Sequence, residues 1–239
     1  MTETTTVPSE TGPRDPKAAL LAAIESHVPF DGWTESAFRA AIADSGVEPA
    51  VARGVCPRGA VDLALAFHEE GDAEMLRRIR EADLGGLRFR DRIAQAVRFR
   101  LEAAPDREMV RRGVTLFALP NHAPDGAKAL WSTVDRIWEA LGDTSDDVNW
   151  YTKRATLAGV YSATLLYWLG DDSPGHTRTW EFLDRRIGEV MRFEKLKADV
   201  NGNPVMKQLL KLPNWALGFV RAPSRGPRTN LPGSLTGSK

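Results

Sequence analysis

Residues 138–154 read WEALGDTSDDVNWYTKR, an acidic turn between two stretches with helical spacing. Asp143 and Ser145 favour turns and helix caps, because short polar side chains compete for nearby backbone N–H groups. Trp150 and Tyr151 open the second helical stretch. Large aromatic side chains beside a turn either fill a core or anchor a partner protein. The segment therefore predicts a helix–turn–helix corner that carries aromatic side chains.

Helical spacing continues on both sides of this corner, and strand-type alternation of polar and apolar residues is nearly absent. Proline, glycine and short polar residues mark the helix starts and stops, as Pro16 and Thr34 do near the N-terminus. The sequence therefore predicts an all-α fold. The expected helices cover residues 16–27, 35–43, 48–53, 58–83, 87–103, 105–119, 123–141, 149–169 and 175–196.

The N-terminal part, residues 15–70, contains two short helices, a turn at Gly46 and a third short helix, an arrangement like a helix-turn-helix. A DNA-binding role would need Lys and Arg side chains that displace counterions from the phosphates. This part instead holds four basic and nine acidic residues, a net charge of −5. We therefore expect a helical bundle without a nucleic-acid partner.

The whole chain has 239 residues, with 32 basic and 32 acidic side chains, one cysteine and four histidines. A lone Cys56 excludes an internal disulfide framework and a multi-cysteine zinc site. Residues 1–14 are polar and match neither a secretory signal nor an Arg-rich transit peptide, so we expect a disordered leader on a bacterial cytoplasmic protein. No catalytic or metal-binding motif stands out in the sequence, so neither catalytic residues nor metal ligands are predicted.

Residues 155–169, ATLAGVYSATLLYWL, carry no charge. A helix that is apolar on every side has to be surrounded by protein or lipid, and this one is shorter than the roughly 18 residues expected of a membrane span. Ala158 and Ser162 belong to a stripe of small residues, which either lets another helix approach or leaves room for a ligand. The residues alone leave two interpretations open, a central core helix and the wall of an apolar cavity.

Residues 201–221 combine a wide apolar face with a narrow cationic one, although Pro213 is expected to kink the helix. This pattern is typical of an amphipathic helix that lies in a membrane interface beside anionic lipid. Packing of this tail on the body or on a second subunit is the alternative. Residues 222–239 are rich in Pro, Gly and Ser and are expected to be disordered. The expected membrane-binding residues are Met206, Lys207, Leu209, Leu210, Lys211, Trp215, Leu217, Phe219, Val220 and Arg221.

Four motifs occur together along the chain. They are LPNHAP at 119–124, WxxxGDxSxDxNWYTxR at 138–154, DSP at 172–174 and TWxFLxxR at 179–186. In these motifs and their spacing, the chain resembles the family of the ubiquinone-biosynthesis accessory protein, the ninth Coq protein. That family resembles the TetR fold and binds lipid rather than DNA. The resemblance therefore implies a TetR-like helical bundle, whose lipid-binding and dimerisation body would span residues 71–200.

The resemblance also implies a function. It points to a non-enzymatic homodimer that lies peripherally on the cytoplasmic face of the inner membrane. Such a protein presents a prenylated quinone precursor to the demethoxy-ubiquinone hydroxylase, a di-iron enzyme. No cofactor is implied, and a bound isoprenoid quinone precursor or phospholipid is expected. A ligand-responsive transcriptional regulator of the TetR type remains the alternative, and an enzyme that acts on lipid is a weaker third.

The same resemblance favours the cavity interpretation of the uncharged helix and makes the corner at 138–154 a docking patch for the hydroxylase. For Trp138, burial in the core is an equal alternative. The expected lipid-binding residues are Phe117, Leu130, Trp131, Ala158, Tyr161, Ser162, Leu165 and Trp168. The expected partner-binding residues are Asp135, Ile137, Trp138, Leu141, Trp150, Tyr151 and Arg154.

Overall fold

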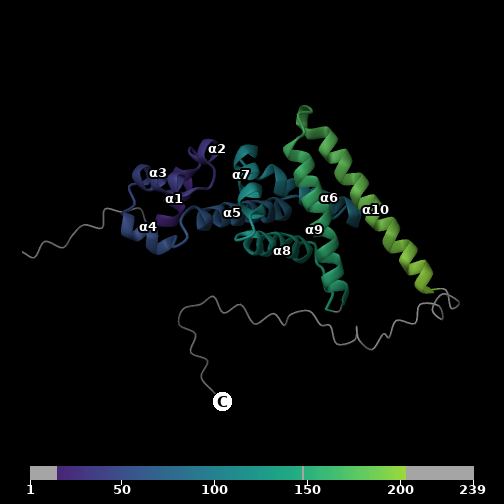
Figure 1. The fold of residues 1–239 in the computed structure, drawn as a ribbon. Helices are drawn as coiled ribbons and strands as arrows, with labels where there is room; N and C mark the ends of the chain where they lie inside the picture. The colour runs from purple at the N-terminus through teal and green to yellow at the C-terminus, as the bar shows by residue number, and fades with distance from the viewer. Residues whose placement is uncertain (1–14, 147, 203–239) are drawn as a thin grey trace, which may run out of the picture.

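The computed structural model describes residues 15–146 and 148–202, and within these ranges the chain is helical without strands (Figure 1). The predicted all-α fold class is confirmed. The predicted leader at 1–14 and tail at 222–239 lie outside the described residues. So does nearly all of the predicted amphipathic helix, because only residues 201 and 202 of it are described.

Four short helices form the N-terminal part around one hydrophobic cluster. Helix N-caps hold them in place: the side chain of Thr34 accepts from the Ala37 amide, as the sequence predicted, and Asp15 caps α1 in the same way. The helix expected over 16–27 ends earlier, because Pro29 cannot continue it and instead sits in the first turn of α2. The helices are α1 (Pro16–Ile24), α2 (Val28–Asp31), α3 (Glu35–Ser45) and α4 (Pro49–Val55).

Six longer helices follow, and α5 runs from the N-terminal part into the body (Figure 1). Its Leu63 belongs to the N-terminal hydrophobic cluster and its Met75 to the cluster of the body, so one helix joins the two cores. α5 begins at Ala60, two residues later than expected. Its N-cap residue, Gly59, has a φ of 63°, a positive value that an α-helix does not contain and that disfavours every residue type except glycine. The helices are α5 (Ala60–Glu81), α6 (Phe89–Glu102), α7 (Arg107–Ala118), α8 (Ala123–Ala140), α9 (Val148–Leu169) and α10 (Thr177–Gly202).

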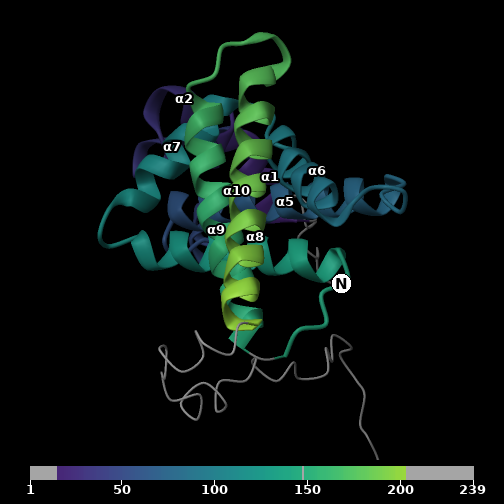
Figure 2. The ribbon, with the colours of Figure 1, turned by 90° about the vertical axis from the view of Figure 1, so that its right-hand side faces the viewer.

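α9 and α10 lie side by side as an antiparallel pair at one end of the body (Figures 1 and 2). A short 3₁₀ turn, η1 (Pro174–His176), joins them. Asp171 organises this connection, because its carboxylate accepts from the amide of Ser173 at 2.9 Å and from the amide and hydroxyl of Thr179 at 2.9 and 2.6 Å. These hydrogen bonds hold the pKa of Asp171 well below its ordinary value. The DSP and TW motifs therefore have a structural role at this corner.

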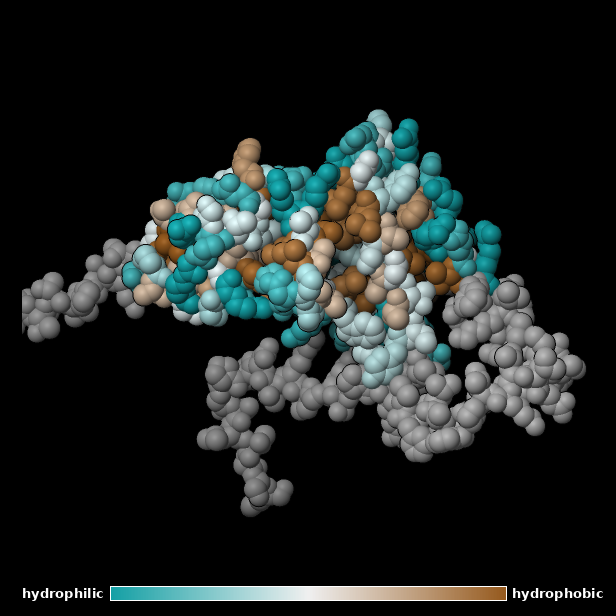
Figure 3. Space-filling view, in the orientation of Figure 1, coloured by the Kyte–Doolittle hydropathy of each residue, from teal (hydrophilic) through white to brown (hydrophobic). Residues whose placement is uncertain are grey.

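α10 ends at Gly202, six residues beyond the expected stop at 196, and so runs across the predicted boundary between body and tail. No helix in the described ranges is both long and apolar enough to span a membrane. Hydrophobic side chains are nevertheless visible on the surface where α9 crosses the body (Figure 3). Leu166 and Tyr167 on α9 are 61% and 38% exposed.

Candidate functional site

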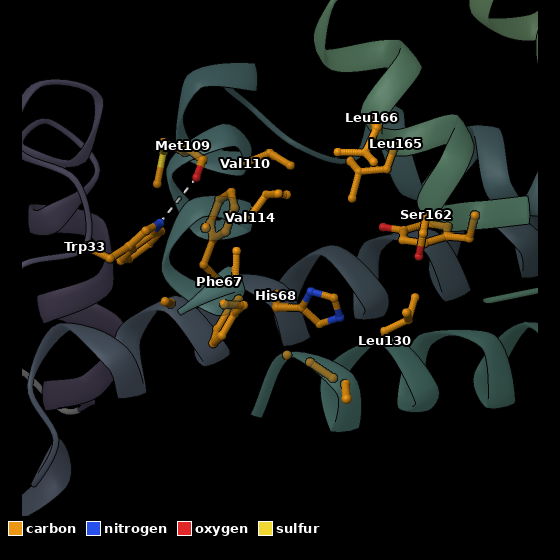
Figure 4. Close-up of a pocket in the computed structure, with 18 of the residues that line it drawn as sticks. Trp33, Phe67, His68, Met109, Val110, Val114, Leu130, Ser162, Leu165 and Leu166 are labelled. Carbon is orange, nitrogen blue, oxygen red and sulfur yellow. Dashed lines mark hydrogen bonds between the residues drawn. The ribbon is translucent and has the colours of Figure 1, made fainter. Parts of the chain in front are cut away.

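A cavity of about 360 Å³ lies between α5, α7, α8 and α9, with mostly apolar side chains in its wall (Figure 4). This volume falls at the lower end of the roughly 300–1,000 Å³ that small-molecule sites enclose. Figure 4 shows side chains of the N-terminal part, such as Trp33, and of the body, such as Leu166, around one space. Five of the eight predicted lipid-binding residues line it, namely Phe117, Leu130, Tyr161, Ser162 and Leu165.

The other three predicted lipid-binding residues lie elsewhere. Trp131 packs against the rings of Trp150 and Tyr151, with centroid distances of 5.8 and 6.4 Å. Trp168 is buried in the core of the body beside His176. Ala158 packs against the same core. Helical spacing placed these residues on α9 and α8 correctly, but it could not tell a core-facing side from a cavity-facing side.

Phe117 was the one residue of α7 predicted to line the cavity, but α7 forms much of the wall through Met109, Val110 and Val114 as well. Val110, Val114 and Phe117 follow an i, i+4, i+7 spacing, the signal of a one-sided apolar helix that could have identified the two valines. Gly126 on α8 lets the two helices meet, because a Cβ there would stand 2.6 Å from the Cβ of Phe117.

α9 turns out to combine both interpretations of the uncharged stretch. Leu157 and Trp168 pack in the core, and Tyr161 and Leu165 pack with the same cluster and also line the cavity. Leu166, a further cavity residue, is 61% exposed. The uncharged stretch 155–169 of α9 is therefore not surrounded by the described residues on every side.

A polar network forms one side of the cavity, centred on the buried carboxylate of Asp72 on α5. Asp72 is 1% exposed and accepts from Arg100 Nε at 2.6 Å, from the Thr133 hydroxyl at 2.8 Å and from Arg136 Nη1 at 3.1 Å. Arg100 belongs to α6, and Thr133 and Arg136 belong to α8. One carboxylate thus joins three helices, and none of its partners was predicted from the sequence.

His68, one turn before Asp72 on α5, lines the cavity. The Thr133 hydroxyl has one proton, which the charged Asp72 attracts, so His68 Nε2 donates to the Thr133 oxygen at 2.8 Å. Its Nδ1 then accepts from Arg100 Nη2 at 3.2 Å. Burial and the nearby positive charge of Arg100 lower the pKa of His68 to about 4, so the ring is neutral at pH 7.

The aromatic corner is built over a buried cation. Arg154 is fully buried, stacks on the ring of Trp150 at 4.0 Å, and donates to Asp135 at 2.6 Å and to Asp143 at 3.1 Å. Asp143 also accepts from Lys153 Nζ at 2.8 Å. Burial raises the pKa of Asp143, but hydrogen bonds from Lys153, Ser145 and Arg154 outweigh this and lower it to about 2. The acidic turn is therefore held in place by the ion pairs of Asp135 and Asp143 with Lys153 and Arg154, which we call the ion-pair lock.

The predicted partner-binding residues divide between the inside and the surface of this corner. Ile137 and Arg154 are completely buried, and Trp138 and Trp150 are 8% and 7% exposed. Arg154 therefore lies inside the corner, against the buried ring of Trp150. The half-buried members, which a partner could contact, are Asp135, Leu141 and Tyr151.

The N-terminal part offers little to a nucleic acid. α3 and α4 form the helix pair, and Arg53 is the one basic residue of α4. Its guanidinium is paired with both carboxylate oxygens of Glu35 and lies over the ring of Phe38. A second helix of such a pair reads the major groove with free side chains. The described residues also contain no cluster of three or more His, Cys, Asp or Glu side chains that could hold a metal.

The low pKa of His68 predicts a pH-dependent stability. As the pH falls from 7 to 5, the unfolded chain takes up a proton at His68 but the folded chain does not. The free energy of unfolding should therefore drop by about 2 kcal/mol over this range. Urea unfolding at both pH values measures it, with His68→Gln as the comparison. An equal loss of stability in the variant would contradict the assignment.

The buried cation predicts a contrast between two neighbouring residues. Arg154→Met leaves Asp135 and Asp143 without their partner, which should cost about 3–5 kcal/mol of unfolding free energy. The side chain of Lys153, the other partner of Asp143, is 38% exposed. Lys153→Met should therefore lower the free energy of unfolding by less than about 1 kcal/mol. Thermal and denaturant unfolding of both variants distinguishes the two. Similar small losses would show that the ion-pair lock contributes little.

Residues 123–194, which contain α8, α9 and most of α10, match the family model described as COQ9. The ubiquinone biosynthesis protein COQ9, mitochondrial, of Drosophila melanogaster is 35% identical over 191 residues, which cover 78% of this chain and 58% of that protein. The proteins of the same name from Rattus norvegicus and Homo sapiens are 36% and 34% identical over 180 residues, which cover 72% of this chain and 57% and 56% of theirs. The chain thus spans less than two thirds of the length of these relatives.

The fold is similar to that of a TetR transcriptional regulator from Nitrosomonas europaea. The TM-score is 0.61 at 21% sequence identity, and the match covers 73% of this chain and 98% of that one. This likeness confirms the TetR-like fold. The family match and the curated relatives show that the chain belongs to the COQ9 family.

Proposed function

We propose that the protein is a non-enzymatic accessory component of ubiquinone biosynthesis that binds a prenylated quinone intermediate in the cavity between α5, α7, α8 and α9. The observation that carries the proposal is the apolar wall of this cavity, formed by residues such as Val114, Phe117 and Leu130. An apolar cavity of this kind favours a ligand with little exposed polarity. The names of the relatives supply the pathway.

The second part of the proposal is delivery of this intermediate to a di-iron hydroxylase that docks on the aromatic corner. Trp131, Trp150 and Tyr151 form a continuous aromatic cluster there. Arg154 and its two aspartates fix the cluster from below. Rigid aromatic side chains over a well-packed support are typical of interaction hot spots, because little entropy is lost when a partner binds.

The third part is attachment to the cytoplasmic face of a bacterial inner membrane as a homodimer. The cationic and apolar pattern of residues 201–221 supports membrane attachment. The exposed Leu166 and Tyr167, with Tyr167 stacked on Phe182 of α10, support dimerisation through α9 and α10. Water disfavours an apolar face of this kind on a free helix pair.

A ligand-responsive transcriptional regulator is the rival function, and the TetR-like fold favours it. The charges oppose it, because residues 15–70 carry a net charge of −5 and Arg53 on α4 is already paired with Glu35. The fold alone does not assign a function, since one fold serves many sites. The accessory role therefore fits the described residues better.

The cavity proposal predicts that Val114→Trp, which fills the space, reduces the amount of bound prenylated lipid by roughly tenfold. The matched control is Thr115→Trp, the next residue on α7, which is exposed. Organic extraction of the purified proteins and mass spectrometry measure the lipid. Extracts of the unaltered protein that contain no prenylated lipid would contradict the proposal, and so would equal amounts in both variants.

The docking proposal predicts that Tyr151→Ala weakens binding to the di-iron hydroxylase by roughly tenfold, the effect of one hot-spot residue. Tyr151 is a better test than Trp150, because Trp150 is buried and its removal would also lower stability. Phe30→Ala, on α2 and 83% exposed, is the control for loss of a surface aromatic ring. A binding titration with both variants, at equal thermal stability, tests the site. Unchanged affinity for Tyr151→Ala would point to a different docking face.

A further inference from the structure

The cavity contains four polar side chains that could meet a ligand, and two of them already form hydrogen bonds with other protein groups. His68 uses both ring nitrogens, one towards Thr133 and one towards Arg100. Arg100 donates to Asp72 and to the His68 carbonyl oxygen as well. The His68 ring and the Nε and Nη2 groups of Arg100 therefore shape one side of the cavity, and they form their hydrogen bonds inside the protein.

The hydroxyl groups of the remaining two, Tyr161 and Ser162 on α9, form no hydrogen bond with the described residues. Tyr161 is only 3% exposed, and its hydroxyl makes no hydrogen bond with any described residue. The Ser162 hydroxyl likewise has no partner there. Both residues line the cavity. A hydroxyl group that lines an apolar cavity and has no protein partner is available to form a hydrogen bond with a ligand.

The surroundings define what this partner offers. Burial raises the pKa of Tyr161, so its hydroxyl keeps its proton and can donate a hydrogen bond. Asp72 is shared between two guanidinium groups, Arg100 and Arg136, so this side of the cavity has a positive rather than a negative potential. Such a potential favours an oxygen that presents lone pairs, and the apolar remainder of the wall favours an uncharged molecule.

We infer that the hydroxyls of Tyr161 and Ser162 donate hydrogen bonds to a ring oxygen of an uncharged oxygenated ring, such as a benzoquinone carbonyl, that carries an apolar tail. This inference rests on the proposed function and adds which end of the ligand the cavity encloses. The ring lies at the Tyr161 side, next to His68, and the tail leaves past Leu165 and Leu166.

The placement of these residues sets this direction. In Figure 4, His68 and Ser162 face the same space, and Leu165 and Leu166 lie one turn further along α9. Exposure rises along this path, from the buried Tyr161 to Leu166 at 61%. The volume of about 360 Å³ is small for a long-chain lipid, so most of a prenyl tail would follow the apolar surface outside.

The test compares two probes of equal tail, a benzoquinone with a two-isoprene chain and the hydrocarbon with the same chain. The full-length protein should bind the quinone more tightly, and Tyr161→Phe should reduce its affinity for the quinone by roughly three- to tenfold, the effect of one hydrogen bond. Affinity for the hydrocarbon should not change. Ser162→Ala should act in the same direction. Tyr167→Phe is the control, because Tyr167 lies on the same helix outside the cavity.

The outcomes separate this inference from the proposed function. If the unaltered protein binds neither probe, the proposed function fails. If it binds the quinone and the hydrocarbon equally, or if Tyr161→Phe and Ser162→Ala both keep full affinity for the quinone, the cavity binds the tail and the ring inference is overturned. If Tyr161→Phe does not fold, Ser162→Ala and the probe comparison on the unaltered protein still decide the question.

Discussion

The buried carboxylate of Asp72 is the constraint on which the body of this protein depends. A carboxylate that is 1% exposed would be strongly destabilising on its own, and here it is compensated by hydrogen bonds from Arg100, Thr133 and Arg136. These partners come from α6 and α8, so the position of three helices is fixed by one charge. Gly71 belongs to the same arrangement, because a Cβ at this position would stand 2.7 Å from Arg100 Nη1. The network also orients His68, and through it one side of the cavity.

The sequence predicted the helices and the cap at Thr34, because helical spacing and caps are local signals that a few neighbouring residues determine. It also predicted five wall residues of the cavity, and three of them, Tyr161, Ser162 and Leu165, lie on the uncharged stretch from 155 to 169. The Asp72 network could not be predicted, because its members are separated by 28 to 64 residues and no periodicity connects them. Trp131 was placed in the cavity for a related reason. A pattern shows that a side chain is apolar, but not which neighbour it meets.

At the aromatic corner, the composition suggested charged side chains in solvent, but the structure buries some of them. The three aspartates between 143 and 154 suggest a solvated acidic turn by composition, yet the side chain of Asp143 is buried and bound to Lys153 and Arg154. A buried cation at this position is stable only because two carboxylates and the ring of Trp150 surround it. The aromatic cluster therefore stands on a rigid base. Such a base keeps Tyr151 in place before any partner arrives, and this reduces the entropy lost on binding.

The stretch 155–169 of α9 carries no charge and still lies partly at the surface. Its core side packs Leu157 and Trp168, its cavity side presents Tyr161, and its outer side exposes Leu166. An outer side that met only water would tolerate Lys or Glu at no cost, whereas Leu166 and Tyr167 form an exposed apolar surface that suits contact with an apolar molecule. Leu166 on this side also lines the cavity. In the proposed function, a lipid tail that leaves the cavity and an adjoining helix of a second subunit would both meet this surface, so the binding of cargo and the association of subunits would be linked.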